Sequence, residues 1–197
     1  MEHTRPRIGR PPIADPEALR SRLLGFIERA GYGNTSMASL AAEAGMSART
    51  LHRYFPAKAD IVWGGIESSI ETLTLELDNA DDGLPVIEAV AAAVAGVFDQ
   101  NAEDLAVMRI RLRLIALTPE LRANRSATFE GWRHAIIGFV AARRGEDPRS
   151  LVAVSAGTAV HTVLLEALSW WALHSEATDP AATIAAALHG LGTLIAS

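Results

Sequence analysis

The sequence contains no cysteine, although it is 197 residues long. The chain therefore has no disulfide framework, no thiol nucleophile and no zinc site built on cysteine, and this composition fits a reducing compartment. The N-terminal region carries charges but lacks the apolar core of a secretory signal peptide. We expect a cytoplasmic protein made of one large domain, or of a small domain joined to a larger one.

Enzyme signatures are also missing from the sequence. It has no HExxH motif, no P-loop and no glycine-rich nucleotide-binding pattern. His134, His161 and His174 are single histidines with no nucleophile or paired carboxylates to work with, and His161 and Glu166 are too poorly phased to share a metal ion on one helix. We expect these histidines to belong to the core or its rim, and we expect no enzymatic activity, no cofactor and no metal site.

Alternating strand patterns are nearly absent, whereas helical periodicity is continuous along the chain. The sequence predicts an all-α protein of about nine helices, with breaks at proline, glycine and aspartate. The expected helices are 16–30, 37–44, 48–54, 57–80, 85–100, 102–117, 119–144, 148–175 and 180–195. Two stretches with little charge, 150–165 and 180–197, are rich in small residues and each contains a histidine. A membrane span needs about 20 strongly apolar residues, so we expect buried helices and no membrane association.

The net charge of −5 is unevenly distributed along the chain. Residues 1–60 hold nine Lys/Arg and six Asp/Glu, whereas residues 61–197 hold nine Arg and 17 Asp/Glu. The positive end begins with an arm, 1–13, that contains Arg5, Arg7, Arg10 and three prolines. Arginines on an extended backbone suit the minor groove of DNA; a tail that only aids solubility is the alternative.

Residues 34–54 fit a helix-turn-helix. Ala41 supplies a small residue where the two helices touch, Gly45 suits the turn, and Leu51 is the apolar anchor of the second helix. That second helix, 48–54, contains two arginines, a threonine, a histidine and a tyrosine but no acidic residue. These side chains can bind base edges and phosphates, whereas a merely solvated face would mix lysine with glutamate. The pattern therefore favours DNA binding.

The same region resembles the N-terminal domain of the tetracycline-repressor (TetR) family, over residues 14–63. The residues that carry this resemblance are Thr35-x4-Leu40-Ala41-x2-Ala44-Gly45-Met46-Ser47-x2-Thr50-Leu51-His52-Arg53-Tyr54-Phe55-Pro56-x-Lys58-x2-Ile61. The aromatic-Phe-Pro-x-Lys segment is the most specific part, and His52 is a departure, since many members carry Tyr there. The resemblance implies a DNA-binding domain at 14–60 and a ligand-binding and dimerisation domain at 61–197.

It also implies the roles of individual residues. Contacts with phosphates are expected from Thr35, Ser36 and Lys58. The residues expected to enter or flank the major groove are Ser47, Ala48, Arg49, Thr50, His52, Arg53 and Tyr54. The expected partner is a palindromic double-stranded operator, bound by a homodimer.

The helix expected at 102–117 is apolar on two opposite faces, so it should be buried on both sides. Arg109 and Arg113 lie along one seam between these faces, and Arg111 lies along the other. Half-buried arginines need acidic partners or an anionic ligand. Ion pairs with Glu103, Glu130 or Glu166 and an anchor for a carboxylate or phosphate remain alternatives.

Aromatic residues after position 117 are either plain core or the walls of a ligand pocket. The run from Met108 to Arg122, followed by Trp132, is similar to TetR-family members that resemble the mycofactocin regulator, some of which sense acyl-coenzyme A thioesters. The candidate ligand-binding residues are Trp63, Met108, Arg109, Leu112, Arg113, Phe129, Trp132, Arg133, Ile136 and Trp170. The expected effector is a small hydrophobic or anionic molecule, with an acyl-CoA as one candidate.

The last two expected helices are rich in alanine and glycine and nearly free of charge. By family resemblance they form a homodimer interface; an intramolecular core is the alternative. The sequence as a whole predicts a ligand-responsive transcriptional regulator, a repressor released from its operator by the effector. The alternative is a helical protein that stores a hydrophobic ligand without any DNA function, and it leaves the basic arm unexplained.

Overall fold

The computed structural model describes residues 15–100, 105–123, 127–176 and 179–196, and within these ranges it contains eleven α-helices, one 3-10 turn and no strand. The prediction of an all-α fold is confirmed. The helices are α1 Pro16–Ala30, α2 Met37–Glu43, α3 Ala48–Tyr54, α4 Lys58–Trp63, α5 Ser68–Asp78, α6 Val86–Gln100, α7 Leu105–Leu117, α8 Pro119–Ala123, α9 Ala127–Arg144, α10 Leu151–His174 and α11 Ala181–Ala196, and the 3-10 turn is Tyr32–Asn34.

The prediction of one continuous helix over 57–80 is wrong. The chain forms α4 and α5 instead, and the non-helical residues 64–67 between them are called the joint. Gly65 has φ +83°, a conformation that glycine adopts without the steric cost that a Cβ adds. The expected helix 119–144 also corresponds to two helices, α8 and α9, on either side of residues that lie outside the described ranges.

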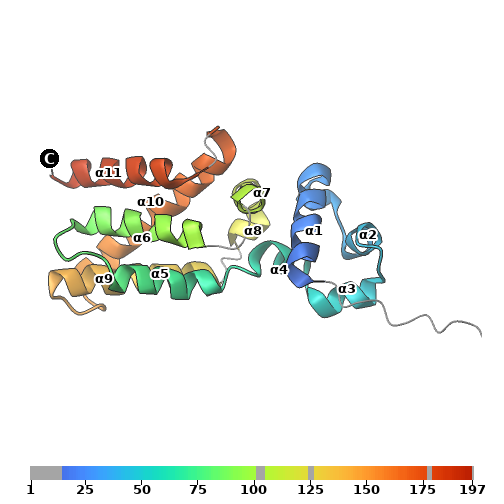
Figure 1. The fold of residues 1–197 in the computed structure, drawn as a ribbon, viewed down its shortest axis with the longest axis horizontal. Helices are drawn as coiled ribbons and strands as arrows, with labels where there is room; N and C mark the ends of the chain where they lie inside the picture. Colours follow the sequence, from blue (N-terminus) through green and yellow to red (C-terminus); the bar gives the residue numbers. More distant parts are fainter. Residues whose placement is uncertain (1–14, 101–104, 124–126, 177–178, 197) are drawn as a thin grey trace, which may run out of the picture.

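The helices are arranged as a small end and a larger body (Figure 1). We call α1, α2 and α3 the head and α5 to α11 the body, and α4 leads from the head toward the body. Helix α7 packs against α1, α4, α8 and α10, so it contacts both parts of the molecule. Within the body, α10 packs against α9, α11 and α7, and α5 packs against α6 and α9.

Local signals explain why the head folds as it does. The Asp15 carboxylate accepts from the Glu17 amide, with Pro16 at the first position of α1. Ser36 and Ser47 cap α2 and α3 by accepting the amides of Ser39 and Thr50, both at 3.1 Å. Each cap satisfies an amide that would otherwise lack a partner, so the three head helices begin where the sequence predicts.

Helix α10 is the one helix among the described residues that is long and apolar enough to cross a membrane. Only 39% of its apolar window is buried inside the protein. Its buried face includes Val160, Leu164, Leu168 and Trp171, all of which belong to the main core. Core helices also pass a test of length and composition, so this helix is weak evidence for a membrane span.

Candidate functional site

Helix α3 is anchored to the head by two apolar side chains and presents basic ones to solvent. Leu51 is 0% exposed and Phe55 is 2% exposed, and both belong to the main core. Arg49, His52 and Arg53 are exposed. The helix thus offers a rigidly held basic face, which is the arrangement that docks into a major groove.

The other predicted α3 residues lie on or beside this face. Ser47 and Ala48 are exposed at its N-terminal end, while Thr50 and Tyr54 are half-buried. The Ser47 and Thr50 hydroxyls lie 2.8 Å apart, and His52 Nδ1 lies 3.1 Å from the Pro56 carbonyl oxygen. These contacts orient the side chains locally and leave the two arginines of α3 exposed.

The three expected phosphate ligands differ in their surroundings. Ser36 is exposed at the start of α2, as that role requires. Thr35, in contrast, is buried and its hydroxyl donates to the Tyr32 carbonyl at 3.0 Å. Lys58 Nζ donates to the carbonyl oxygens of Tyr32 at 2.6 Å and Thr35 at 2.9 Å, and it lies 3.9 Å from the centre of the Tyr32 ring.

Thr35 and Lys58 therefore hold the loop between α1 and α2 against α4 in this structure. Burial lowers the pKa of Lys58, because desolvation penalises its charged form, while the charge of Glu120 opposes this shift. These carbonyls take two of the three N–H donors of Lys58, so a direct phosphate contact from this position has to use the third. The arm residues Arg5, Arg7 and Arg10 lie outside the described residues.

A small, mainly apolar cavity of about 40 Å³ lies within the body. Its lining comes from α5, α6, α7, α9 and α10, together with Ile66 just before α5. Four of the predicted ligand residues line it: Met108, Leu112, Phe129 and Trp132. Trp132 Nε1 donates to the Ser69 hydroxyl at 2.9 Å, and this hydroxyl donates to the Ile66 carbonyl at 2.6 Å.

Two further predicted ligand residues are close to this cavity without being part of its lining. The Trp63 ring packs edge-on against the Phe129 ring, with centroids 4.9 Å apart. Ile136 is fully buried in the surrounding core.

The structure places the remaining four predicted ligand residues elsewhere. Arg109 and Arg113 donate to the carbonyls of Trp171 and Ala172 at the end of α10, at 3.2 Å, and Arg113 also pairs with Glu28 of α1 at 2.7 Å. Carbonyls in the last turn of a helix carry partial negative charge, which attracts both guanidinium groups, and the Trp171 carbonyl also accepts the Ser175 amide at 3.2 Å. The acid that pairs with Arg113 is none of the three considered from sequence.

Arg133 and Trp170 are also away from the cavity. Arg133 pairs with Glu130 at 3.0 Å, and hydrogen bonding from Arg133 is the main cause that lowers the pKa of the Glu130 carboxyl. Trp170 is 53% exposed and lines a groove between α10 and α11. Its exposure results from its position on the outer side of α10.

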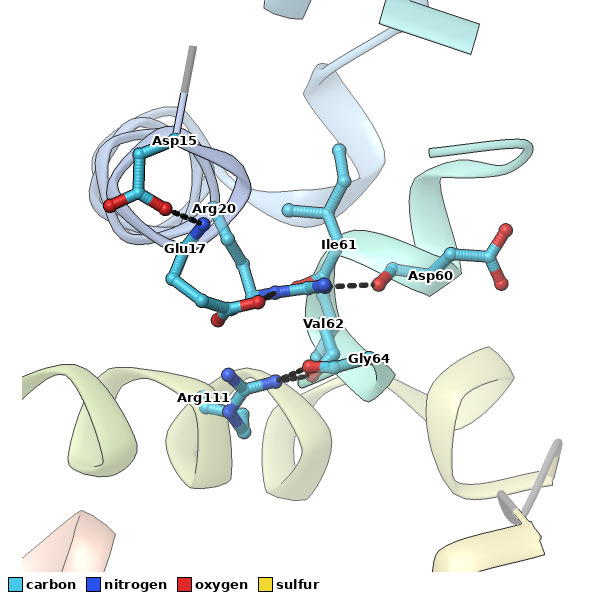
Figure 2. Close-up of polar contacts among 8 residues, drawn as sticks. All are labelled: Asp15, Glu17, Arg20, Asp60, Ile61, Val62, Gly64 and Arg111. Atoms are coloured by element: carbon cyan, nitrogen blue, oxygen red, sulfur yellow. Dashed lines mark hydrogen bonds and ion pairs between the residues drawn. The ribbon is translucent and has the colours of Figure 1, made fainter. Parts of the chain in front are cut away.

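The sequence reasoning missed the charged residue that does line the cavity, Arg111. It is only 1% exposed and donates to the backbone carbonyls of Val62 and Gly64 at the end of α4 (Figure 2). The signal was present: Arg111 follows Met108 by three residues and precedes Ile115 by four, so it lies beside both on one face of the helix. The other lining residues that were not predicted are Ile66, Ser69, Val97, Phe98, Ile115, Thr128, Leu165 and Leu168.

The head and the body each match a known family. Residues 25–62 match the model of bacterial regulatory proteins of the tetR family, and residues 84–196 match the model of the MftR C-terminal domain. A basic helix-turn-helix joined to this type of helical body defines a DNA-binding transcriptional regulator. The chain belongs to the TetR family, with a C-terminal domain of the MftR type.

Individual relatives align with this chain over most of the length of both proteins. The chain is 28% identical over 186 residues to a Mycobacterium tuberculosis protein described as the mycofactocin biosynthesis transcriptional regulator MftR, covering 94% of this chain and 93% of that protein. Thermus thermophilus FadR, a TetR-family repressor solved in complex with lauroyl-CoA, superposes with a TM-score of 0.55 at 16% identity, covering 90% of this chain and 93% of FadR. A transcriptional regulator from Rhodococcus sp. Rha1 gives 0.55 at 18% identity, covering 92% and 96%.

The prediction of a ligand-responsive transcriptional regulator of the TetR family is confirmed by these matches. Regulators of this family bind DNA operators and small-molecule effectors. The family is regulatory, which agrees with the expectation that the chain is not an enzyme.

Proposed function

We propose that the chain is a repressor whose α3 helix binds the major groove of its operator. In this proposal residues 14–60 form the DNA-binding domain and residues 61–197 form the domain for effector binding and dimerisation. Residues 1–13 are an arm that binds the minor groove. The observation that carries this proposal is the exposed basic face of α3 above the buried Leu51 and Phe55. The acidic body supports it, because repulsion keeps DNA away from everything except the basic end.

The decisive experiment is to select operator DNA from a random duplex pool and to measure its affinity at several salt concentrations. We expect specific, steeply salt-dependent binding, since each phosphate contact contributes about 0.9 to the slope of log K against log salt. Removal of residues 1–13 lowers both slope and affinity if the arm contacts DNA. A protein that retains no duplex at low salt would instead be the storage protein considered from sequence.

Dimerisation through α10 and α11 is the second part of the proposal. Apolar side chains on α10 are left exposed in the single chain, including Leu151 at 81%, Trp170 at 53% and Val152 at 49%. Exposed apolar patches of this kind mark protein–protein interfaces, and a two-fold pair of heads matches a palindromic operator whose half-sites lie about 34–36 Å apart. Sedimentation is expected to give a dimer at micromolar concentration; a stable monomer contradicts this interface.

The effector we propose is a molecule with an apolar chain and an oxygen-bearing polar group, such as an acyl-CoA. The apolar lining of the cavity supports this class, and so does the acyl-CoA complex of the similarly folded FadR. The cavity of about 40 Å³ holds only about three water molecules, so an effector must push its walls apart. The expected result is that lauroyl-CoA, titrated into the operator complex, releases the DNA.

The remaining parts of the proposal are a cytoplasmic location and an action that needs no cofactor, metal ion or membrane. The family to which the chain belongs supports the location, since its members are transcriptional regulators. Fractionation of cells that produce the full chain tests it, with the protein expected to remain in the fraction that holds the DNA and the cytosol.

A further inference from the structure

The C-terminal end of α4 is held from two sides by arginines (Figure 2). From α1, Arg20 Nη1 donates to the carbonyl oxygens of Asp60 at 2.6 Å and Ile61 at 3.3 Å. From α7, Arg111 Nη1 donates to the carbonyl oxygens of Val62 and of Gly64, the latter at 2.9 Å. Carbonyls at the end of a helix carry partial negative charge, so both guanidinium groups stabilise this end. The Asp60 carbonyl also accepts the Gly64 amide at 3.0 Å.

Glycines in the joint after α4 leave the space that the Arg20 side chain occupies. A Cβ atom on Gly64 would lie 2.7 Å from Arg20 Nη1 and 2.8 Å from the Asp60 carbonyl oxygen. Gly65, at φ +83°, would place a Cβ 2.8 Å from Glu17, whose carboxylate pairs with Arg20 at 3.2 Å. Arg20 is thus packed tightly between α1 and the joint.

Arg111 differs from Arg20 in one respect: it also lines the cavity in the body. Its polar companions in that lining are Ser69 and Thr128, and the remaining lining residues are apolar or aromatic. A molecule that enters the cavity with a polar group therefore meets the same guanidinium that holds α4. Ile66 in the joint and Ser69 just after it also line the cavity, so the bulk of the molecule presses on the same segment.

A second donor lies at the same end of α4. Trp63, the last residue of the helix, is 8% exposed, and its Nε1–H is buried with no hydrogen-bond partner among the residues that the structure describes. A buried donor without an acceptor is costly, and an oxygen supplied by a ligand relieves that cost. The Trp63 ring already packs against Phe129, which lines the cavity.

We propose that Arg111 is the positioning residue that converts effector binding into release of α4. An oxygen acceptor on an apolar chain, the carboxylate of a fatty acid or the thioester carbonyl of an acyl-CoA, takes the guanidinium from the carbonyls of Val62 and Gly64. A carboxylate favours this exchange because it carries a full negative charge and can accept two parallel N–H bonds from one guanidinium, whereas each backbone carbonyl is a neutral acceptor. A thioester carbonyl is as neutral as the carbonyls it replaces, so the burial of its apolar chain must drive the exchange. This inference rests on the proposed function and adds to it the group that senses the effector.

Release of Arg111 acts on the head because α4 also packs against α1. With two of its four held carbonyls freed, α4 is bound less firmly to α7, while Arg20 still ties it to the head. The head then moves relative to its partner head, and the spacing between the two α3 helices no longer matches the operator. The effector shifts this equilibrium only by its differential affinity for the two states, so its affinity must also fall when operator is bound.

The test measures operator affinity with and without three probes: dodecanoate, dodecanoyl-CoA and dodecylamine. In the wild-type protein we expect dodecanoate, dodecanoyl-CoA or both to weaken operator binding by about 5- to 150-fold, the usual range for coupled sites. Which of them acts identifies the source of the oxygen. Dodecylamine carries the same chain with a cationic group, so it is expected to have no effect on operator affinity.

Four variants separate sensing from a general loosening of α4. In Arg111→Met the oxygen-bearing probes are expected to leave operator affinity almost unchanged. Arg111→Lys keeps a cationic donor, so part of the probe effect on operator affinity is expected to remain. Arg20→Met weakens operator binding without any probe but keeps the fold-change that the probe causes, because Arg20 does not line the cavity. Arg149→Met, at an exposed position, is the matched control.

Each failure has its own meaning. If a folded Arg111→Met protein shows the same probe-induced fold-change in operator affinity as the wild type, the role of Arg111 is refuted. The same holds if dodecylamine weakens operator binding as much as dodecanoate does. It also holds if an oxygen-bearing probe binds the wild-type protein but leaves its operator affinity unchanged. A wild-type protein that binds no operator refutes the proposed function itself. A further measurement needs no ligand: amide hydrogen exchange in α4 and the start of α5 is expected to be faster in Arg111→Lys than in Arg149→Met, and equal rates count against the hold on α4.

Discussion

Arginine serves opposite purposes in α3 of the head and α7 of the body. Arg49 and Arg53 are exposed on a short helix whose other side is anchored by Leu51. In α7, Arg109, Arg111 and Arg113 all donate to backbone carbonyls at the ends of other helices. The difference teaches that packing decides the role of a cation: an exposed arginine is available to another molecule, whereas a buried or half-buried one connects helices of its own chain.

The sharpest way to break this comparison is the double variant Arg49→Ala/Arg53→Ala. Each loss is expected to cost about 1–3 kcal/mol of operator binding, so the pair costs up to about 6 kcal/mol if the effects add. The free energy of unfolding is expected to change by no more than about 0.5 kcal/mol per exposed site. Gel-shift titration and urea denaturation measure the two quantities. Unchanged operator affinity refutes the assignment of α3 as the DNA-reading helix.

Arg111→Met is the converse test on α7. The substitution leaves the buried carbonyl of Val62 and the part-buried carbonyl of Gly64 without this donor, which is expected to lower the free energy of unfolding by about 1–3 kcal/mol. Arg49→Met is the matched substitution on α3 and is expected to leave unfolding within about 0.5 kcal/mol of the wild type. Equal stability of the two variants in urea would show that the comparison between the helices does not hold.

Close helix packing in the body gives the next prediction. A Cβ on Gly157 of α10 would lie 2.7 Å from the Ile137 Cα of α9, so Gly157→Ala forces these helices apart and is expected to cost about 1–3 kcal/mol of stability. Gly138 of α9 has open space where its Cβ would lie. Gly138→Ala is therefore the control, expected to stabilise by about 0.5–1 kcal/mol through helix propensity. Thermal melting that ranks the two variants in the opposite order contradicts this packing.

The turn of the head gives the smallest expected effect. Gly45 has φ +69° and open space around its would-be Cβ, so only backbone strain opposes a side chain there. Gly45→Ala is expected to cost about 1–2 kcal/mol, and Gly45→Asn less, because asparagine tolerates this conformation. If alanine and asparagine destabilise equally in denaturant titrations, a clash and not the dihedral angle limits this position.

The sequence predicted the head far better than the body because the head's signals are local. The caps at Asp15, Ser36 and Ser47 act over two or three residues, and the structure contains each of them. The joint between α4 and α5 was missed because helical periodicity continues through Gly64 and Gly65. In the body, four of ten expected ligand residues line the cavity, and the arginine in its wall, Arg111, lies on the opposite seam of α7 from the two arginines that were expected to bind the ligand.

The sequence alone determined the all-α fold, the start and end of the head's helices and the basic character of α3, because capping, periodicity and charge act between neighbours in the chain. Only the tertiary structure decided which arginine lines the cavity and which carbonyls the cations hold. Lys58 reaches Tyr32, and Arg111 reaches Gly64, across 26 and 47 positions of sequence. Such pairings depend on how helices pack against one another, and no spacing within a single helix specifies them.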